Sequence, residues 1–349
     1  MARVTIDGVS DFRPETSARF KLDSRTATVA TKRKFDEQVA ALDALRELPV
    51  ENCTDPLRTA LTNRNNFIVA KAADLVREFR LEQLVPDLLS AFDRFFQNAE
   101  KTDPQCWAKN ALSKTLAAFE HQEAETFLRG VRHIQMEPVW GGRSDTAGTL
   151  RATCALALVQ CRTLTEADLL AYWIELFADK DKTVRVEVLR AIAQLGSPSA
   201  ALLLRARAVL GNDEPEVLGA CYGGVLGIDG DSAIPWAAKF MASADDAAGE
   251  AALAISATNS IAAFECLKQH LLEAADPWWR SVLLSAIALC RQEIALEFLL
   301  TQVRTESLYA EGAIEAILRS GPSTETVQRL EEVVSANSRL ARVFNKHRP

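Results

Sequence analysis

Histidines and carboxylates are the residues that could carry acid–base or metal chemistry in this chain, and their spacing suits neither. The four histidines, His121, His133, His270 and His347, lie far apart in the sequence. Even His121 and His133 are about three helical turns apart, too far for one helix to offer both to a shared ligand. No HExxH, GxSxG, CxxC or phosphate-binding glycine loop occurs in the sequence. We therefore expect no catalytic residues, no metal site and no cofactor.

Residues 137–148 offer a different kind of chemistry. This segment combines an aromatic ring, Trp140, with the flexible pair Gly141 and Gly142, the guanidinium of Arg143 and several acids. Loops of this composition are where repeat proteins place specific contacts. Trp140 and Arg143 are therefore candidate partner-binding residues. The alternative is an ordinary inter-helix loop in which Trp140 folds back on the core.

Three glycines recur every fourth residue in one predicted helix, at Gly219, Gly223 and Gly227. Glycine inside a helix costs about 0.5–1 kcal/mol relative to alanine, so three on one face predict that something large approaches the backbone. An adjacent helix is one candidate, with Tyr222 and Trp236 packed nearby. A bound partner segment is the other, and it makes the three glycines candidate partner-binding residues.

A pair of adjacent tryptophans, Trp278 and Trp279, follows Asp276 and Pro277 at the start of a predicted helix. Neighbouring helical residues point about 100° apart, so both rings are buried only if the helix is covered on two sides. Either both rings close the core, or one stays exposed as a contact residue, and we take Trp278 as the candidate.

A repeated pattern of acid, turn and helix must position all these residues. In its clearest copy an acid precedes the turn, a Val-Arg pair opens a helix, and Ala and Gly follow at helical spacing: Asp179, Val184, Arg185, Ala191, Gly196 and Ala200. Looser copies begin near Asn65, Asp103, Asp145, Asn212, Asp245, Asp276 and Glu306, at intervals of 30–42 residues. That period predicts two-helix repeats and an all-α fold.

On these residues the chain resembles HEAT-repeat α-solenoid proteins, in particular the subtype named after phycobilisome lyases. The resemblance implies a right-handed α-solenoid of about eight helix pairs over residues 35–349, clearest over 55–335. It also implies a structural ladder in which each acid caps a turn and each base reaches the acid of the neighbouring repeat: Asp103 with Lys109, Asp145 with Arg151, and Asp179 with Arg185. Later copies carry Leu218, Glu250 or Glu311 at the basic position, so the ladder should be broken there.

Composition limits the partner and the compartment. The net charge is −7, each end of the chain carries +4, and the residues between carry −15. Such an acidic body opposes nucleic acid and favours a basic or amphipathic protein partner. Residues 1–34 are expected to form an extended or poorly ordered basic leader. Seven cysteines without a paired spacing, no secretory signal and no long apolar run predict a cytoplasmic protein with no membrane span.

The sequence thus favours a non-enzymatic protein–protein interaction scaffold that binds a partner on its concave face. Two alternatives remain open: an enzyme or chaperone similar to bilin lyases, and a HEAT-like DNA glycosylase. An apolar slot on the concave face would favour the first of these, and a cationic concave face would favour the second.

Overall fold

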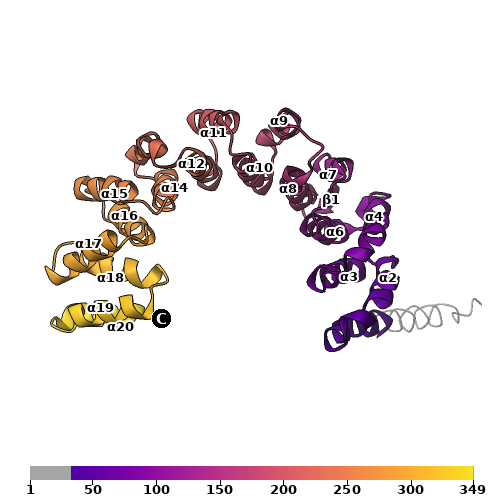
Figure 1. Ribbon diagram of the computed structural model, residues 1–349, viewed down its shortest axis with the longest axis horizontal. Helices are drawn as coiled ribbons and strands as arrows, with labels where there is room; N and C mark the ends of the chain where they lie inside the picture. The colour runs from indigo at the N-terminus through magenta and orange to yellow at the C-terminus, as the bar shows by residue number, and fades with distance from the viewer. Residues whose placement is uncertain (1–32, 349) are drawn as a thin grey trace, which may run out of the picture. The chain divides into compact units, whose positions relative to one another are not determined.

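The computed structural model describes residues 33–348, and most of them lie in helices (Figure 1). The predicted all-helical character is confirmed, apart from one short hairpin. Residues 1–32 of the predicted leader lie outside the described residues, and a helix already covers residues 33–44. Contacts between Cα atoms divide the chain into two compact units, Met1–Phe119 and Glu120–Pro349. Between residues 33 and 348, no helix is long and apolar enough to cross a bilayer.

The first unit consists of α-helices joined by 3₁₀ turns. After the helix at 33–44, its elements are η1 (Leu45–Glu47), η2 (Val50–Asn52), α2 (Thr54–Leu61), α3 (Asn66–Glu78), η3 (Glu82–Leu84), α4 (Val85–Arg94), α5 (Ala99–Thr102), η4 (Pro104–Cys106) and α6 (Trp107–Ala118). Helix α3 packs against α2 and α6, and α4 packs against both α2 and α6. The 3₁₀ turn η3 leads directly into α4.

The second unit continues the alternation of helices. Its elements are α7 (Ala124–Val131), β1 (Met136–Val139), β2 (Gly142–Asp145), α8 (Gly148–Ala157), η5 (Leu158–Gln160), α9 (Glu166–Ile174), η6 (Glu175–Ala178), α10 (Lys182–Gln194), α11 (Pro198–Leu210), α12 (Pro215–Asp229), η7 (Gly230–Ala233), α13 (Ile234–Ala238), η8 (Lys239–Ser243), α14 (Asp246–Ser256), α15 (Ile261–Glu273), α16 (Pro277–Leu289), α17 (Glu293–Arg304), α18 (Ala310–Arg319), α19 (Thr324–Val334) and α20 (Ser338–His347).

These helices form two layers within the second unit. Helices α8, α10, α12, α14, α16, α18 and α20 make an inner row in which each packs against the next. The intervening helices make an outer row, and α11, α15 and α17 each contact the inner helices on both sides (Figure 1). The core between the rows consists of Ala, Val, Leu and Ile side chains such as Leu189, Leu204 and Leu283, all fully buried. Small alanines in the inner row let neighbouring helices approach closely.

Short polar residues set where the helices begin, as the sequence predicts. Asp276 Oδ1 accepts a 2.8 Å hydrogen bond from the N–H of Trp279, and Pro277 is the first residue of α16. Ser197 caps α11 in the same way, with Pro198 as its first residue. A side-chain oxygen at this position satisfies an N–H group that has no partner within the helix.

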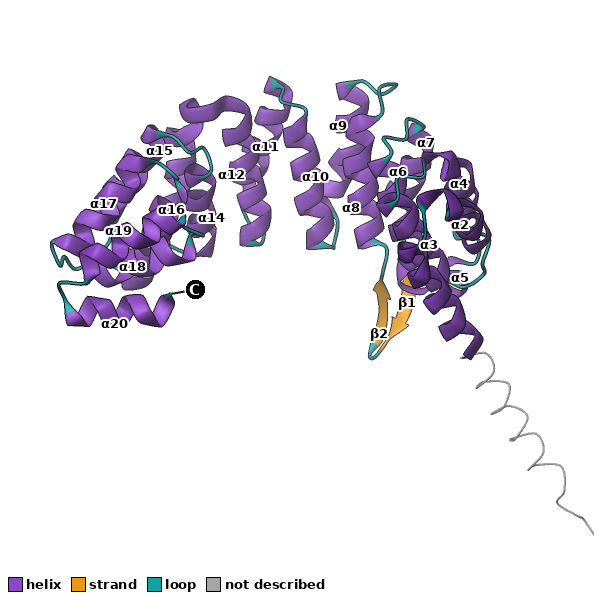
Figure 2. Ribbon diagram, turned by 60° about the horizontal axis from the view of Figure 1, so that its bottom comes forward, coloured by secondary structure: helices purple, strands orange, loops and turns teal. Residues whose placement is uncertain are grey.

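Strands β1 and β2 are the one departure from the expected helical pattern. They form an antiparallel pair in which Val139 lies opposite Gly142, so Trp140 and Gly141 make a two-residue turn. Gly141 has φ 90°, a left-handed conformation that glycine adopts without strain. The sequence predicted a loop for this segment, and Pro138 and the two glycines are indeed unusual in strands. The hairpin projects beyond the ends of the neighbouring helices of its unit (Figure 2).

Candidate interaction site at the hairpin

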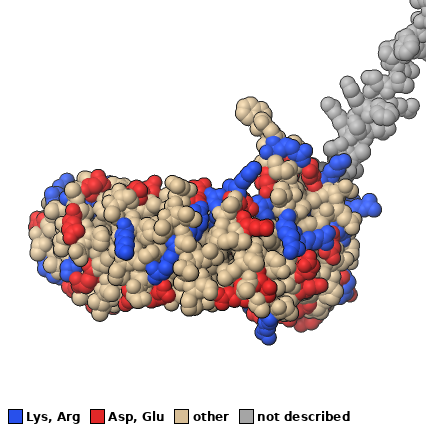
Figure 3. Space-filling model, turned by 90° about the horizontal axis from the view of Figure 1, so that it is seen from above, with Lys and Arg blue, Asp and Glu red and all other residues tan. Residues whose placement is uncertain are grey.

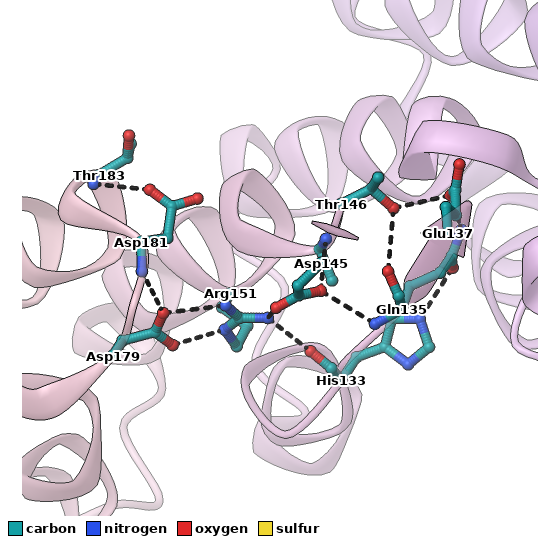
Figure 4. A network of polar contacts seen from close by, with 10 residues as sticks. His133, Gln135, Glu137, Asp145, Thr146, Arg151, Asp179, Asp181 and Thr183 are labelled. Atoms are coloured by element: carbon teal, nitrogen blue, oxygen red, sulfur yellow. Dashed lines mark hydrogen bonds and ion pairs between the residues drawn. The ribbon is translucent and has the colours of Figure 1, made fainter. Parts of the chain in front are cut away.

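Arg151 on α8 joins the hairpin to the next helix pair. Its guanidinium forms two parallel bonds to the carboxylate of Asp179, from Nε at 2.8 Å and from Nη2 at 3.0 Å. Nη1 donates to Asp145 Oδ2 at 2.6 Å and to the carbonyl oxygen of His133 at 3.0 Å (Figure 4). Paired geometry of this kind fixes both distance and orientation. The end of β2 is thus held rigidly against α8 and against the turn before α10.

The carboxylate of Asp145 is also bound on its other oxygen. Oδ1 accepts 3.0 Å hydrogen bonds from the main-chain N–H groups of Gln135 and Ala147. Burial alone would raise the pKa of Asp145, but these two bonds and Arg151 outweigh it and lower the pKa. A single ionised side chain therefore fixes the residue before β1, the end of β2 and the start of α8.

A second group of hydrogen bonds closes the base of the hairpin. The N–H of Thr146 donates to the carbonyl of Gln135 at 2.9 Å, which continues the β-ladder by one pair. The hydroxyl of Thr146 and Nε2 of Gln135 both donate to Glu137 Oε1, at 2.7 and 2.6 Å. The ring of His133 contacts Gln135 Oε1 at 3.0 Å. Gln135, Thr146 and this role of His133 were not predicted, since no signal in the sequence marks the segment as a hairpin.

The far end of the hairpin is apolar and exposed. Trp140 at the tip is 104% exposed and Val139 beside it is exposed, while Ile134 and Met136 are exposed apolar residues at the base of the hairpin. The alternative in which Trp140 folds back on the core is therefore wrong. A fully hydrated indole gains nothing in packing from this fold, so its position needs another explanation.

A groove of about 780 Å³ runs beside β2, between the hairpin and the turn that precedes α10. Its apolar walls include Val131, Ile134, Met136 and Leu176. Charges of both signs line the same groove: Arg132, Arg143, Arg151, Lys180, Asp145, Glu175, Asp179 and Asp181. Arg143 also donates to the carbonyl of Met136. An apolar groove with mixed charges suits an amphipathic segment better than a strongly charged one.

The other predicted ladder residues form two further ion pairs: Lys109 pairs with the acid of its own repeat, and Arg185 pairs with an acid of the next repeat. In the first unit, Lys109 Nζ lies 3.0 Å from Asp103 Oδ2, both side chains are fully buried, and Asp103 accepts hydrogen bonds from the start of α6. In the second unit, Arg185 donates to the main-chain oxygen of Asp179 and lies 2.9 Å from Asp213. Asp179 itself does not cap α10, because Asp181 does so with a 2.8 Å bond from Thr183.

The ladder ends at α12. The predicted position, Leu218, was counted from Asn212, but Arg185 binds Asp213. The residue six positions after Asp213 is Gly219, which has no side chain to continue the series. A Cβ at Gly219 would collide with the carboxylate of Glu250, which fills this space from α14. Burial raises the pKa of Glu250, and the charge of Glu216 raises it further. Gly219 is therefore occupied from within the fold and is a poor candidate for a partner site.

The remaining predictions, for glycines and tryptophans, have different outcomes. No heavy atom of another element would lie within 4 Å of a Cβ at Gly223 or Gly227, so the adjacent-helix alternative is wrong at these two positions, and both stay candidate partner-binding residues. Tyr222 and Trp236 do pack together, with ring centroids 6.1 Å apart. Trp279 is buried, whereas Trp278 is 46% exposed at the start of α16 and remains a candidate contact residue.

Several charges on the inner helices are paired. Lys182 lies 2.7 Å from Glu216, Arg190 lies 2.6 Å from Glu187, and a 2.8 Å ion pair joins Arg319 to Glu315. Figure 3 views the molecule from above, on the side of the outer row, and shows basic and acidic side chains interspersed there. That outer face has no continuous basic surface of the kind that nucleic acid binding needs.

Within residues 33–348, no group of three or more metal-ligating side chains comes together. No protein-family model and no curated protein matches this chain.

Proposed function

We propose that this chain is a non-enzymatic interaction scaffold that binds a protein partner through the hairpin at residues 136–145. In this proposal the helix pairs belong to a right-handed α-solenoid of about eight HEAT-like repeats, whose stacking gives the hairpin a stiff support. The observation that carries the proposal is the full exposure of Trp140 at the tip of a hairpin whose base is fixed by buried ion pairs.

This combination suits a contact residue. A tryptophan in water gives up the hydrophobic stabilisation that it gains when buried, and a partner that covers it would recover that stabilisation. Because Asp145 and Arg151 hold the hairpin in place before binding, little conformational entropy is lost when a partner docks. Tryptophan and arginine also contribute more binding energy at interfaces than most residues do. Arg143 lies on the same hairpin and completes the candidate contact.

The groove beside β2 indicates the chemistry of the partner. Its apolar walls and mixed charges suit an amphipathic segment whose apolar side chains cover Met136 and Ile134. The acidic middle of the chain adds a long-range attraction for basic partners and speeds their encounter. Trp278 on the inner row is a second candidate contact for a partner long enough to reach it.

Paired alanine substitutions test the proposal. Trp140→Ala should leave the helical circular dichroism and the melting midpoint near those of the parent, because the indole makes no packing contact with the core. It should weaken the capture of the partner that co-purifies from the native host. Leu202→Ala is the matched control, since Leu202 is 69% exposed on α11 and should affect neither measurement. Equal capture by both variants and the parent would place the partner site elsewhere.

A further inference from the structure

Three aromatic side chains form a continuous strip on the first unit. Phe35 lies on the helix at 33–44, Phe67 is the second residue of α3, and Trp107 is the first residue of α6, which packs beside α3 (Figure 1). The ring centroids of Phe35 and Phe67 are 5.6 Å apart, as are those of Phe67 and Trp107. Phe35 and Phe67 are half-buried, whereas Trp107 is 46% exposed. The strip therefore ends in a large apolar surface that faces water.

The turn before Trp107 is held in an unusual conformation. Gln105 and Cys106 have φ of 58° and 55°, in the left-handed region that residues other than glycine rarely adopt. The carboxylate of Asp103 fixes this turn, because it accepts hydrogen bonds of 2.8 and 3.0 Å from main-chain N–H groups at the start of α6. Asn66, the residue before the middle ring of the strip, donates a 3.0 Å hydrogen bond to the same carboxylate. One buried acid thus positions two rings of the strip in advance, which lowers the entropy lost on binding.

Exposed cations lie around the open end of the strip. Arg64 comes two residues before Asn66, and Lys101 lies in α5, just before the turn. Lys114 lies two helical turns after Trp107, on the same face of α6. Among residues 33–348, the side chains of these three cations make no hydrogen bond and no ion pair. They are therefore available to a negatively charged ligand.

The acids near the strip already have partners. Those on the helix at 33–44 and on α3 form ion pairs of 3.0, 2.6 and 2.7 Å: Glu37 with Arg33, Asp43 with Lys71, and Asp74 with Arg77. Glu100, beside Lys101, also has a partner. Lys34 and Asp36 are exposed and offset each other. The surface around the strip thus has a local surplus of positive charge, and acids further away are screened beyond about 8 Å at physiological salt.

We propose that the aromatic strip binds a short acidic peptide segment of a protein partner. Apolar side chains of the segment cover Trp107, and its carboxylates pair with Arg64 and Lys101. A tryptophan covered in this way contributes much of the binding energy, while the charges orient the segment. In the described part of the chain the indole N–H of Trp107 has no acceptor, so it is free to donate to a peptide carbonyl. The inference stands independently of the proposed contact through Trp140.

The geometry of the rings favours a peptide over a single-stranded nucleic acid. Proteins that bind single strands stack successive bases on exposed aromatic faces. Here neighbouring rings contact each other and are tilted by 55° and 56°, so no base fits between them. Trp107 alone is largely exposed, and it offers one stacking face. A peptide needs only this one apolar contact together with a few charges beside it.

Fluorescence anisotropy with two labelled peptides tests the inference. One probe has a Leu-Phe-Leu core between pairs of glutamates, and the other has lysines in place of the glutamates. The full chain should bind the glutamate probe about tenfold more tightly, or better. Trp107→Ala should weaken that binding by about tenfold or more while the helical circular dichroism is unchanged. Trp278→Ala is the matched control, because Trp278 is also 46% exposed, and it should bind as the parent does.

A charge reversal keeps the test decisive if Trp107→Ala unfolds. Arg64→Glu alters no packed ring and should weaken binding of the glutamate probe, whereas Arg162→Glu, at an exposed cation of the second unit, should not. Trp140→Ala should bind the probe like the parent while losing its own partner, so the two proposals fail separately.

Several results would overturn the inference. They are a parent that does not bind the glutamate probe, equal binding of the two probes, and equal binding by the parent and the Trp107 and Arg64 variants. Tighter binding of a single-stranded thymidine oligonucleotide than of the glutamate probe would assign the strip to nucleic acid. A parent that dimerises in sedimentation, beside a monomeric Trp107→Ala, would assign it to a second copy of the chain.

Discussion

Arg151 on α8 and Gly219 on α12 each lie six residues after an acid. The surroundings of these two positions are stabilised in opposite ways. At the first, a guanidinium joins Asp145 and Asp179 and fixes the hairpin. At the second, the base is absent, and the carboxylate of Glu250 lies over the bare backbone.

The buried ion pairs contribute something that helix stacking does not. Apolar packing continues through both levels, since α12 contacts α10 and α14 as closely as α8 contacts α10. The helical stack therefore does not require the ion pairs. They are found where an irregular segment, the hairpin, must be held in one orientation, and removing them should uncouple that segment from the stack.

Arg151→Met should cause the largest loss of stability. This change leaves Asp145 and Asp179 without their shared cation in a nearly buried site, which should lower the free energy of unfolding by about 3–5 kcal/mol. Urea denaturation measures the loss. Arg132→Met is the control, because Arg132 is 58% exposed and its ion pair with Glu125 should contribute about 0–1 kcal/mol. Similar losses in the two variants would show that the buried network has no special role.

Arg185→Ala should have the next largest effect. Arg185 bonds to the Asp179 main chain and to Asp213, but Arg207 also pairs with Asp213, so one acid keeps a cation after the change. We expect a loss of about 1.5–3 kcal/mol, typical of a hydrogen bond to a charged group. Thermal unfolding at neutral pH measures it. An unchanged melting midpoint would mean that the ladder does not contribute to stability at this level.

Alanine substitutions at the glycines of α12 should change the free energy of unfolding by less. One of them, Gly223→Ala, should increase stability. Gly223→Ala meets no atom within 4 Å and should stabilise the protein by about 0.5–1 kcal/mol, because alanine loses less entropy in a helix. Gly219→Ala should gain less or lose stability, since Glu250 must move. If Gly219→Ala were as stabilising as Gly223→Ala, Glu250 would not occupy the site.

The smallest effect should be a pH dependence at Glu250. Because the folded protein raises the pKa of Glu250, the folded state binds its proton more tightly than the unfolded state does. Stability should therefore fall as pH rises from the unfolded pKa of about 4.3 through the higher folded value. Glu250→Gln should raise the melting midpoint at neutral pH and change it little below pH ~4. An equal gain at both pH values would point to packing and not to charge.

The sequence predicted the helical fold because its signals are local. Helix caps such as Asp276, prolines at helix starts and the spacing of buried alanines each act within one or two turns. The acid-to-base spacing likewise brought Asp145, Arg151 and Asp179 together as candidates.

The hairpin was not predicted because residues outside its two strands stabilise it. Its two short strands carry few strand-forming residues, and residues outside them, Gln135 and Arg151, hold it in place. The adjacent-helix alternative failed at Gly223 for a related reason: helix periodicity shows which face a residue lies on but not what lies opposite. Glu250 was recognised as a break in the ladder, yet only the packing of α14 on α12 places its carboxylate over Gly219.

Site-specific photocrosslinking tests most directly whether Trp140 at the hairpin tip contacts the partner. A photoreactive amino acid replaces Trp140 in the native host, and a second chain carries it at Leu202, which is also exposed and apolar. If the hairpin tip is the contact site, irradiation should give a discrete crosslinked protein from position 140 and none from position 202. Crosslinking that is absent from position 140, or equal at the two positions, would contradict the account.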